Sequence, residues 1–149
     1  MVDIEGWVDP ASPYRSMTPT RLLDSRQGPG ASTGAMTGSA GLALPVAGVA
    51  TIGADSAAVD LNVTAVDPSA DGFVTVWPCG QPRPNSSSLN FPAGRTVANL
   101  AISSVCPSGT VCFASNVDTQ IVVDAQGWFA GDSGLSPDQP DPVDRHPGR

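Results

Sequence analysis

The chain has 149 residues, a size that fits one domain with terminal extensions. Its net charge of -7 and pI near 4.2 argue against nucleic-acid partners, and no apolar run approaches the roughly 18 residues needed for membrane insertion. With 16 Gly, 15 Pro, no Lys and many Ser, Thr and Val, the composition favours short strands joined by turns. We therefore predict an all-β protein.

The first residues duplicate a later segment of the chain. Residues 2–8, VDIEGWV, align without gaps on residues 123–129, VDAQGWF, and share Val, Asp, Gly and Trp. Such a repeat is typical of tandem arrays, so we expect residues 1–9 to be the end strand of a preceding repeat or an N-terminal strand. The first five residues lack the basic start and apolar core of a signal peptide, which favours an excised piece with an added Met. Residues 10–19 are expected to be a Pro- and Ser-containing connector.

The block RLLDSR begins the predicted domain, residues 20–130. Its guanidinium groups would suit a ligand-binding strip, but the two Leu residues at its centre indicate a strand that buries one side. Two further carboxylates lie between apolar neighbours in later strands, and buried carboxylates need partners. We therefore favour a structural polar clasp made of Arg21, Asp24, Arg26, Asp60 and Asp124. The Gly-rich residues 27–41 that follow are expected to form a long, mobile loop.

Strand patterns begin at Leu42. Residues 58–66 alternate apolar and polar side chains, residues 67–72 have the composition of a turn, and residues 73–77 fit the returning strand of a β-hairpin.

A second strand pair is predicted at residues 97–105 and 110–114, with CPSG between them as a tight connection, and residues 120–129 close the domain. Several short strands with turns about every ten residues indicate an antiparallel β-sandwich with long loops, either jelly-roll-like or a partly closed barrel. Residues 131–149 are rich in Pro and Asp and are expected to be a disordered tail or linker.

Three cysteines leave alternatives open. Cys79, Cys106 and Cys112 have no zinc-site spacing, so no metal is expected. They are consistent with one disulfide and one spare thiol in an exported protein, or with three thiols in a cytosolic one. We favour export, to the cell surface or the extracellular space.

Four motifs follow one another in order: TPTRLLDSR, VDLNVTAVDPSADGFVTVWPCGQPRPNSSSLNF, GRTVANLAIS and TQIVVDAQGWF. Together, over residues 14–129, they resemble a domain found repeatedly, often in tandem, in exported and cell-surface proteins of actinobacteria. That family usually has Thr where Ser25 stands here. The resemblance implies a Cys79–Cys112 disulfide, with a Cys106–Cys112 bond as the alternative, and it implies location and architecture more than chemistry, because the family has no firmly assigned activity.

Catalysis is not indicated. A Ser or Cys nucleophile needs a base, whereas the single His, His146, lies in the tail and Lys is absent. Asp67 and Asp71 would suit calcium by chemistry, but their spacing matches no EF-hand loop and fits an Asx-type turn better. We expect a protein that is not an enzyme and that needs no cofactor.

The most site-like segment is residues 77–91. It combines an aromatic ring, an arginine and several amides on a Pro-containing loop, a mixture that suits sugar binding. The candidate ligand-binding residues are Trp77, Arg83, Asn85 and Asn90. In the alternative, Trp77 and Phe91 pack in the core and the polar residues face water. The sequence thus favours a non-catalytic module for surface adhesion or for binding polysaccharide or cell-wall glycan, and the alternative is a structural repeat that associates with neighbouring repeats or with itself.

Overall fold

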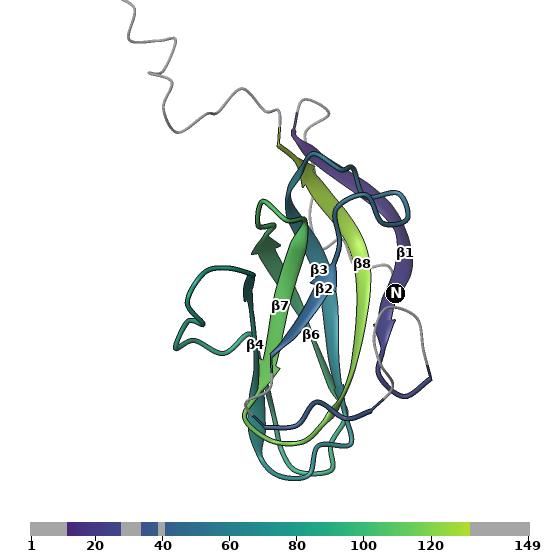
Figure 1. Cartoon of the computed structure of the whole chain (residues 1–149). Helices are drawn as coiled ribbons and strands as arrows, with labels where there is room; N and C mark the ends of the chain where they lie inside the picture. The colour runs from purple at the N-terminus through teal and green to yellow at the C-terminus, as the bar shows by residue number, and fades with distance from the viewer. Residues whose placement is uncertain (1–11, 28–33, 39–40, 132–149) are drawn as a thin grey trace, which may run out of the picture.

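Eight β-strands and no helix make up the part of the chain that this computed structural model describes, residues 12–27, 34–38 and 41–131 (Figure 1). The strands are β1 (Tyr14–Asp24), β2 (Leu42–Pro45), β3 (Ser56–Val66), β4 (Gly72–Pro78), β5 (Leu89–Phe91), β6 (Val97–Ser104), β7 (Thr110–Ser115) and β8 (Gln120–Ala130). The all-β prediction is confirmed.

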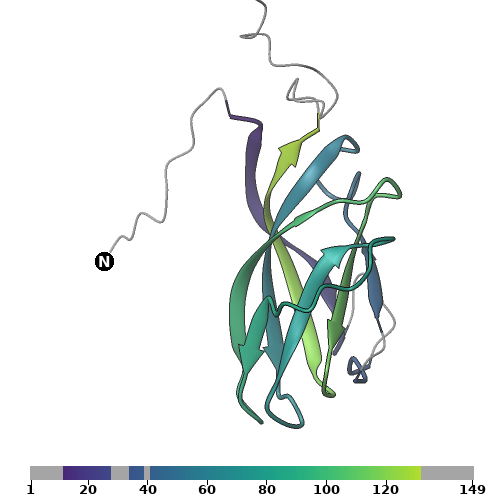
Figure 2. The ribbon, with the colours of Figure 1, turned by 90° about the vertical axis from the view of Figure 1, so that its left-hand side faces the viewer.

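The strands form two four-stranded sheets, in the orders β1-β8-β3-β6 and β2-β7-β4-β5. The sheets lie against each other as two layers (Figures 1 and 2). All pairings are antiparallel, and the first strand pairs with the eighth, the second with the seventh, the third with the sixth and the fourth with the fifth. This nested pairing is that of an eight-stranded jelly roll, so the predicted antiparallel β-sandwich is confirmed in its jelly-roll form, and the described strands form no closed barrel.

The core lies between the two sheets. In β3 the inward side chains Val59, Leu61 and Val63 are fully buried, as the alternation of the sequence predicts. Side chains of the other sheet meet them, among them Leu44, Val74 and Phe113. Burial of each large apolar side chain contributes about 1.5–3 kcal/mol, which makes this layer the main source of stability.

The two predicted strand pairs are wrong as pairs, although their strands exist. Strands β3 and β4 belong to different sheets, and so do β6 and β7. A turn sequence ends a strand but does not determine which layer the next strand joins. Here residues 67–71 and 105–109 carry the chain across the core from one sheet to the other.

The N-terminal part of the domain also differs from the prediction. Strand β1 begins at Tyr14, inside the segment expected to be a connector. In the expected loop at residues 27–41, Met36 is buried and forms a bridge with Thr119. The duplicated segment 2–8 and the tail from 132 onward lie outside the described residues. No helix long and apolar enough to cross a membrane occurs in the described ranges.

Candidate functional site

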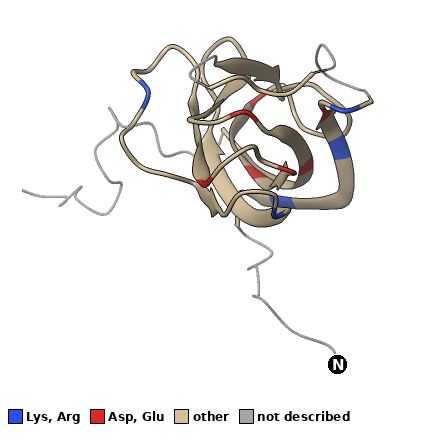
Figure 3. Ribbon diagram, turned by 90° about the horizontal axis from the view of Figure 1, so that it is seen from below, with Lys and Arg blue, Asp and Glu red and all other residues tan. Residues whose placement is uncertain are grey.

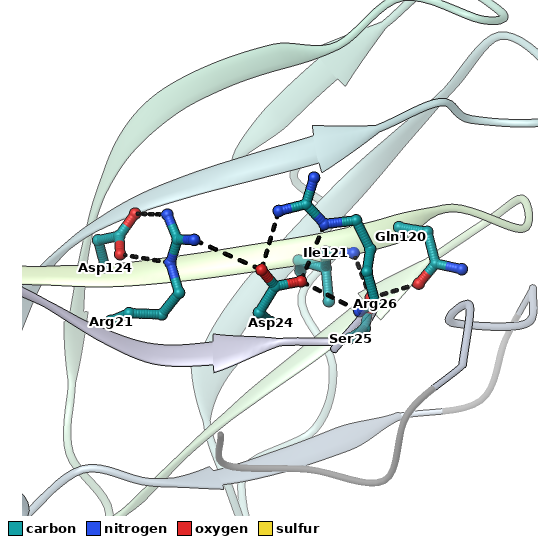
Figure 4. Close-up of polar contacts among 7 residues, drawn as sticks. All are labelled: Arg21, Asp24, Ser25, Arg26, Gln120, Ile121 and Asp124. Carbon is teal, nitrogen blue, oxygen red and sulfur yellow. Dashed lines mark hydrogen bonds and ion pairs between the residues drawn. The ribbon is translucent and has the colours of Figure 1, made fainter. Parts of the chain in front are cut away.

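The predicted clasp is centred on the facing strands β1 and β8, whose register places Arg21 opposite Asp124. Arg21 donates from Nε to Oδ1 of Asp124 at 3.0 Å and from Nη2 to Oδ2 at 3.3 Å (Figure 4). Its Nη1 reaches Oδ2 of Asp24 at 3.4 Å. One arginine therefore joins a carboxylate of the neighbouring strand to a carboxylate of its own strand.

Asp24 is held from its other side by Arg26, as Figure 4 shows. The Arg26 guanidinium donates from Nε at 2.9 Å and from Nη2 at 2.8 Å, and the Arg26 backbone N–H donates at 3.0 Å. These bonds, followed by the positive charges of Arg26 and Arg21, lower the pKa of Asp24 to about 2 although burial opposes this. The Asp24 carboxylate is buried, whereas the side chains of Arg21 and Arg26 remain 46% and 41% exposed. The clasp therefore lies at the surface of the β1–β8 pair, with its two arginines open to solvent, and not inside the core between the sheets.

The Ser25 hydroxyl, in the RLLDSR block, connects β1 to β8 through two hydrogen bonds. Its Oγ accepts a hydrogen bond from the Ile121 N–H at 2.8 Å and donates to Oε1 of Gln120 at 2.6 Å (Figure 4). Ser25 is 3% exposed, so these bonds satisfy a buried polar side chain. The end of β1 is thereby fixed to the start of β8.

Asp60 does not belong to the clasp, contrary to the prediction. It lies opposite Gly127 on β8, and its Oδ2 accepts a hydrogen bond from the Tyr14 hydroxyl at 3.0 Å. A Cβ atom at Gly127 would collide with the Tyr14 hydroxyl, so Tyr14 reaches Asp60 only because position 127 has no side chain. Burial and the bond to Asp60 raise the pKa of Tyr14. Tyr14 could not be identified from the sequence as the partner of Asp60, because only the arrangement of the strands brings the two residues together.

Trp77 and Arg83 form the second candidate site. Trp77 is half-buried, its Nε1 donates to the Gln81 carbonyl at 3.2 Å, and the Arg83 guanidinium carbon lies 6.0 Å from the ring centroid. Cys79, two residues beyond Trp77, is joined to Cys112 of β7 by a disulfide. The disulfide that the resemblance implied is confirmed, and Cys106 is a free, buried thiol.

The loop that carries Arg83, residues 79–88, lies beside β4 (Figure 1) and is tied to it at two more points. The Thr75 hydroxyl donates to the Ser86 carbonyl at 3.1 Å, and the Val76 N–H donates to the Ser88 hydroxyl at 3.1 Å. With the disulfide, these bonds hold both ends of the loop against the sheet.

The other two predicted binding residues are not gathered at Trp77. Asn85 is exposed on the same loop, but Asn90 lies in β5 opposite Phe73. Phe73 is four residues from Trp77 along β4, or about 13 Å at the rise of a strand. Phe91 is 4% exposed and packs in the core, as the alternative interpretation expected for it.

Cys106 lies in the connection between β6 and β7. Its Sγ is 3.0 Å from each of the Ser108 and Thr110 hydroxyl oxygens, and these contacts lower the pKa of the thiol to about 6. Within residues 12–27, 34–38 and 41–131, no three His, Cys, Asp or Glu side chains gather in a way that could hold a metal ion.

Comparison of the chain with protein-family models, with curated proteins and with solved structures finds no match.

Proposed function

We propose that this domain is a non-catalytic extracellular module that binds polysaccharide or cell-wall glycan through Trp77 at the end of β4 and Arg83 in the adjoining loop. One observation carries the proposal. The half-buried indole of Trp77 lies at the end of β4, and the Arg83 guanidinium lies over its ring from the adjoining loop, which a disulfide and two hydrogen bonds hold in place.

This arrangement suits a sugar ring for two physical reasons. The apolar face of a sugar packs on an indole, while a guanidinium such as that of Arg83 donates to its hydroxyls. Because the loop is already ordered, binding loses little conformational entropy. Asn90 is left out of the proposed contact set, since it lies far from Trp77 along the sheet.

An extracellular location is supported by two features. A structural disulfide such as Cys79–Cys112 persists in oxidising compartments and is rare in the cytosol. The ordered motifs of the sequence also resemble those of exported actinobacterial proteins.

The test is a pull-down of the full chain on insoluble polysaccharides and on actinobacterial cell-wall material. We expect saturable binding that Trp77→Ala abolishes and that Arg83→Ala weakens about tenfold or more, in line with the loss of one good stacking or charged contact. Arg95→Ala is the matched control, because Arg95 is an exposed arginine outside this loop. Circular dichroism verifies that each variant is folded. Binding that survives Trp77→Ala would contradict the proposal.

A structural repeat without a small ligand is the second candidate, and one observation favours it. The polar groups around Trp77 already have partners within the domain, since the indole N–H is bonded to Gln81 and the ring carries Arg83. If no glycan is retained by the folded wild-type chain, this second function becomes the better one.

A further inference from the structure

The sandwich has four edge strands, β1 and β6 in one sheet and β2 and β5 in the other. An edge strand presents unpaired backbone N–H and C=O groups, to which a strand of another molecule can pair. Proteins block this pairing with short edges, charged side chains, Pro residues or bulges. The four edge strands can therefore be compared by which of these protective features each one has.

Three edges are protected in this way. β2 has four residues and ends at Pro45, and β5 has only three. β1 is longer, but it contains Arg15, Pro19 and Arg21, and its register with β8 shifts in two places. Neither sheet offers a regular free edge at these strands.

β6 has none of these protective features, although Asn99 donates from Nδ2 to the Ser88 carbonyl of the neighbouring loop at 2.9 Å. The strand spans eight residues, VANLAISS, without a charged residue or Pro. Its register with β3 runs without a shift from Val97 to Ser104. Leu100 and Ile102, which are 51% and 60% exposed, are the large hydrophobic residues that stand out to solvent in the described part of the chain. They are two residues apart and so lie on the same outer face.

We propose that β6 is the docking edge for a second copy of this chain. In this assembly the two β6 strands pair antiparallel about a two-fold axis, and the two four-stranded sheets become one sheet of eight strands. A two-fold interface is closed, so the assembly stops at a dimer.

The side chains of β6 set the register. When the axis passes at Ala101, each Leu100 lies opposite Ile102 of the second copy on the outer face, at the short distance that directly opposed residues have in an antiparallel pair. Towards the core, the small Ala101 side chains meet at the axis and leave room for the backbones to approach. The two exposed apolar residues of one copy are thus covered by those of the other.

The chemistry of β6 favours a second copy over a charged partner. The chain has a net charge of -7, so two copies repel each other at long range. Charged positions occupy only short stretches of the ribbon in Figure 3, and β6 has none. Two copies can therefore pair along β6 without placing charges of the same sign opposite each other.

The first experiment is sedimentation velocity on the full chain over a wide range of concentrations. We expect the wild type to shift from monomer to dimer, and Ile102→Lys to raise the dissociation constant about tenfold or more, because symmetry introduces the unfavourable contact twice. Ala43→Lys is the matched control, since Ala43 is an exposed residue of the edge strand β2. A wild type that is monomeric throughout, a dimer that is unchanged in Ile102→Lys, or association beyond the dimer would overturn the proposal.

A second experiment tests the register. In a Cys106→Ser background, Leu100→Cys and Ile102→Cys variants are prepared separately, mixed and oxidised. We expect the mixed disulfide dimer to form faster than either dimer of like variants, because residue 100 faces residue 102 across the axis. Faster linkage of like variants would overturn the proposed pairing. Glycan binding is unaffected by Ile102→Lys if the Trp77 loop is the site, so the two proposals fail independently.

Discussion

At the scale of single residues, Asp24 is a buried carboxylate that two arginines hold. Its pKa is about 2 in the folded protein against an ordinary value of 3.8. Because the folded value is the lower one, the stabilisation from Asp24 is fully present above about pH 4 and is lost as pH falls through 2. Asp24→Asn should therefore destabilise the protein at neutral pH, and the difference from the wild type should shrink with acidification across this window.

Urea unfolding midpoints between pH 2 and pH 7 provide the measurement. Asp55→Asn is a suitable control, since Asp55 is exposed and makes no ion pair among the described residues. A difference between Asp24→Asn and wild type that stays constant from pH 7 to pH 2 would show that the carboxylate charge is not what stabilises the clasp.

Gly127 permits a contact that a larger residue would prevent. In Gly127→Ala the new methyl group displaces the Tyr14 hydroxyl and leaves Asp60 buried without a partner. We expect a loss of about 1–3 kcal/mol in the free energy of unfolding. A double-mutant cycle with Tyr14→Phe is the sharper measurement, because both changes remove the same bond and their costs should not add. Fully additive costs would mean that Gly127 acts through something other than Tyr14.

The sequence predicts the interaction partners of some of these charged residues but not of others. A clasp that joins Arg21 and Arg26 to Asp24 and Asp124 was predictable, because carboxylates among buried apolar residues need partners, although the individual pairs were not. Asp60 was assigned to the same clasp because it also lies between apolar neighbours in a strand. Its true partner, Tyr14, is 46 residues away and becomes visible only when strand register is known.

At the scale of elements, the disulfide stabilises the loop of residues 79–88 and the whole sandwich together. The bond closes a loop of 33 residues between β4 and β7. Its reduction should lower the free energy of unfolding by about 3–4 kcal/mol through the entropy gained by the unfolded chain. Urea unfolding with and without a reductant measures this loss. Cys106→Ser should lose the same amount on reduction, and a reductant effect that depends on Cys106 would contradict the assigned pairing.

The strands themselves were largely predictable, whereas their partners were not. Alternation places β3, β4, β6, β7 and β8 within about two residues of their observed bounds. The same alternation says only that one face of each strand is buried, which holds equally for a hairpin and for a crossing between layers. β5 escaped prediction because three residues are too few to show a period.

At the scale of the whole molecule, the nested pairing of strands decides which elements become edges. The strands paired in the middle of each sheet, β8, β3, β7 and β4, carry most of the fully buried side chains. The outer strands are left to contact solvent, a ligand or another molecule. The proposed docking edge, β6, is one of these outer strands, whereas Trp77 lies at the end of the central strand β4, beside the loop that leads to the edge strand β5.

The pairing of the first strand with the last also fixes how the domain responds to mechanical force. Tyr14 lies opposite Phe129, and the Ala130 N–H donates to the Pro13 carbonyl, so the chain enters and leaves the sandwich at neighbouring points. A pull applied between these points loads the hydrogen bonds of β1 and β8 one after another, as in opening a zipper, and not all at once in shear. Under tension between these two points, the domain is therefore expected to open first where β1 and β8 begin and end their pairing.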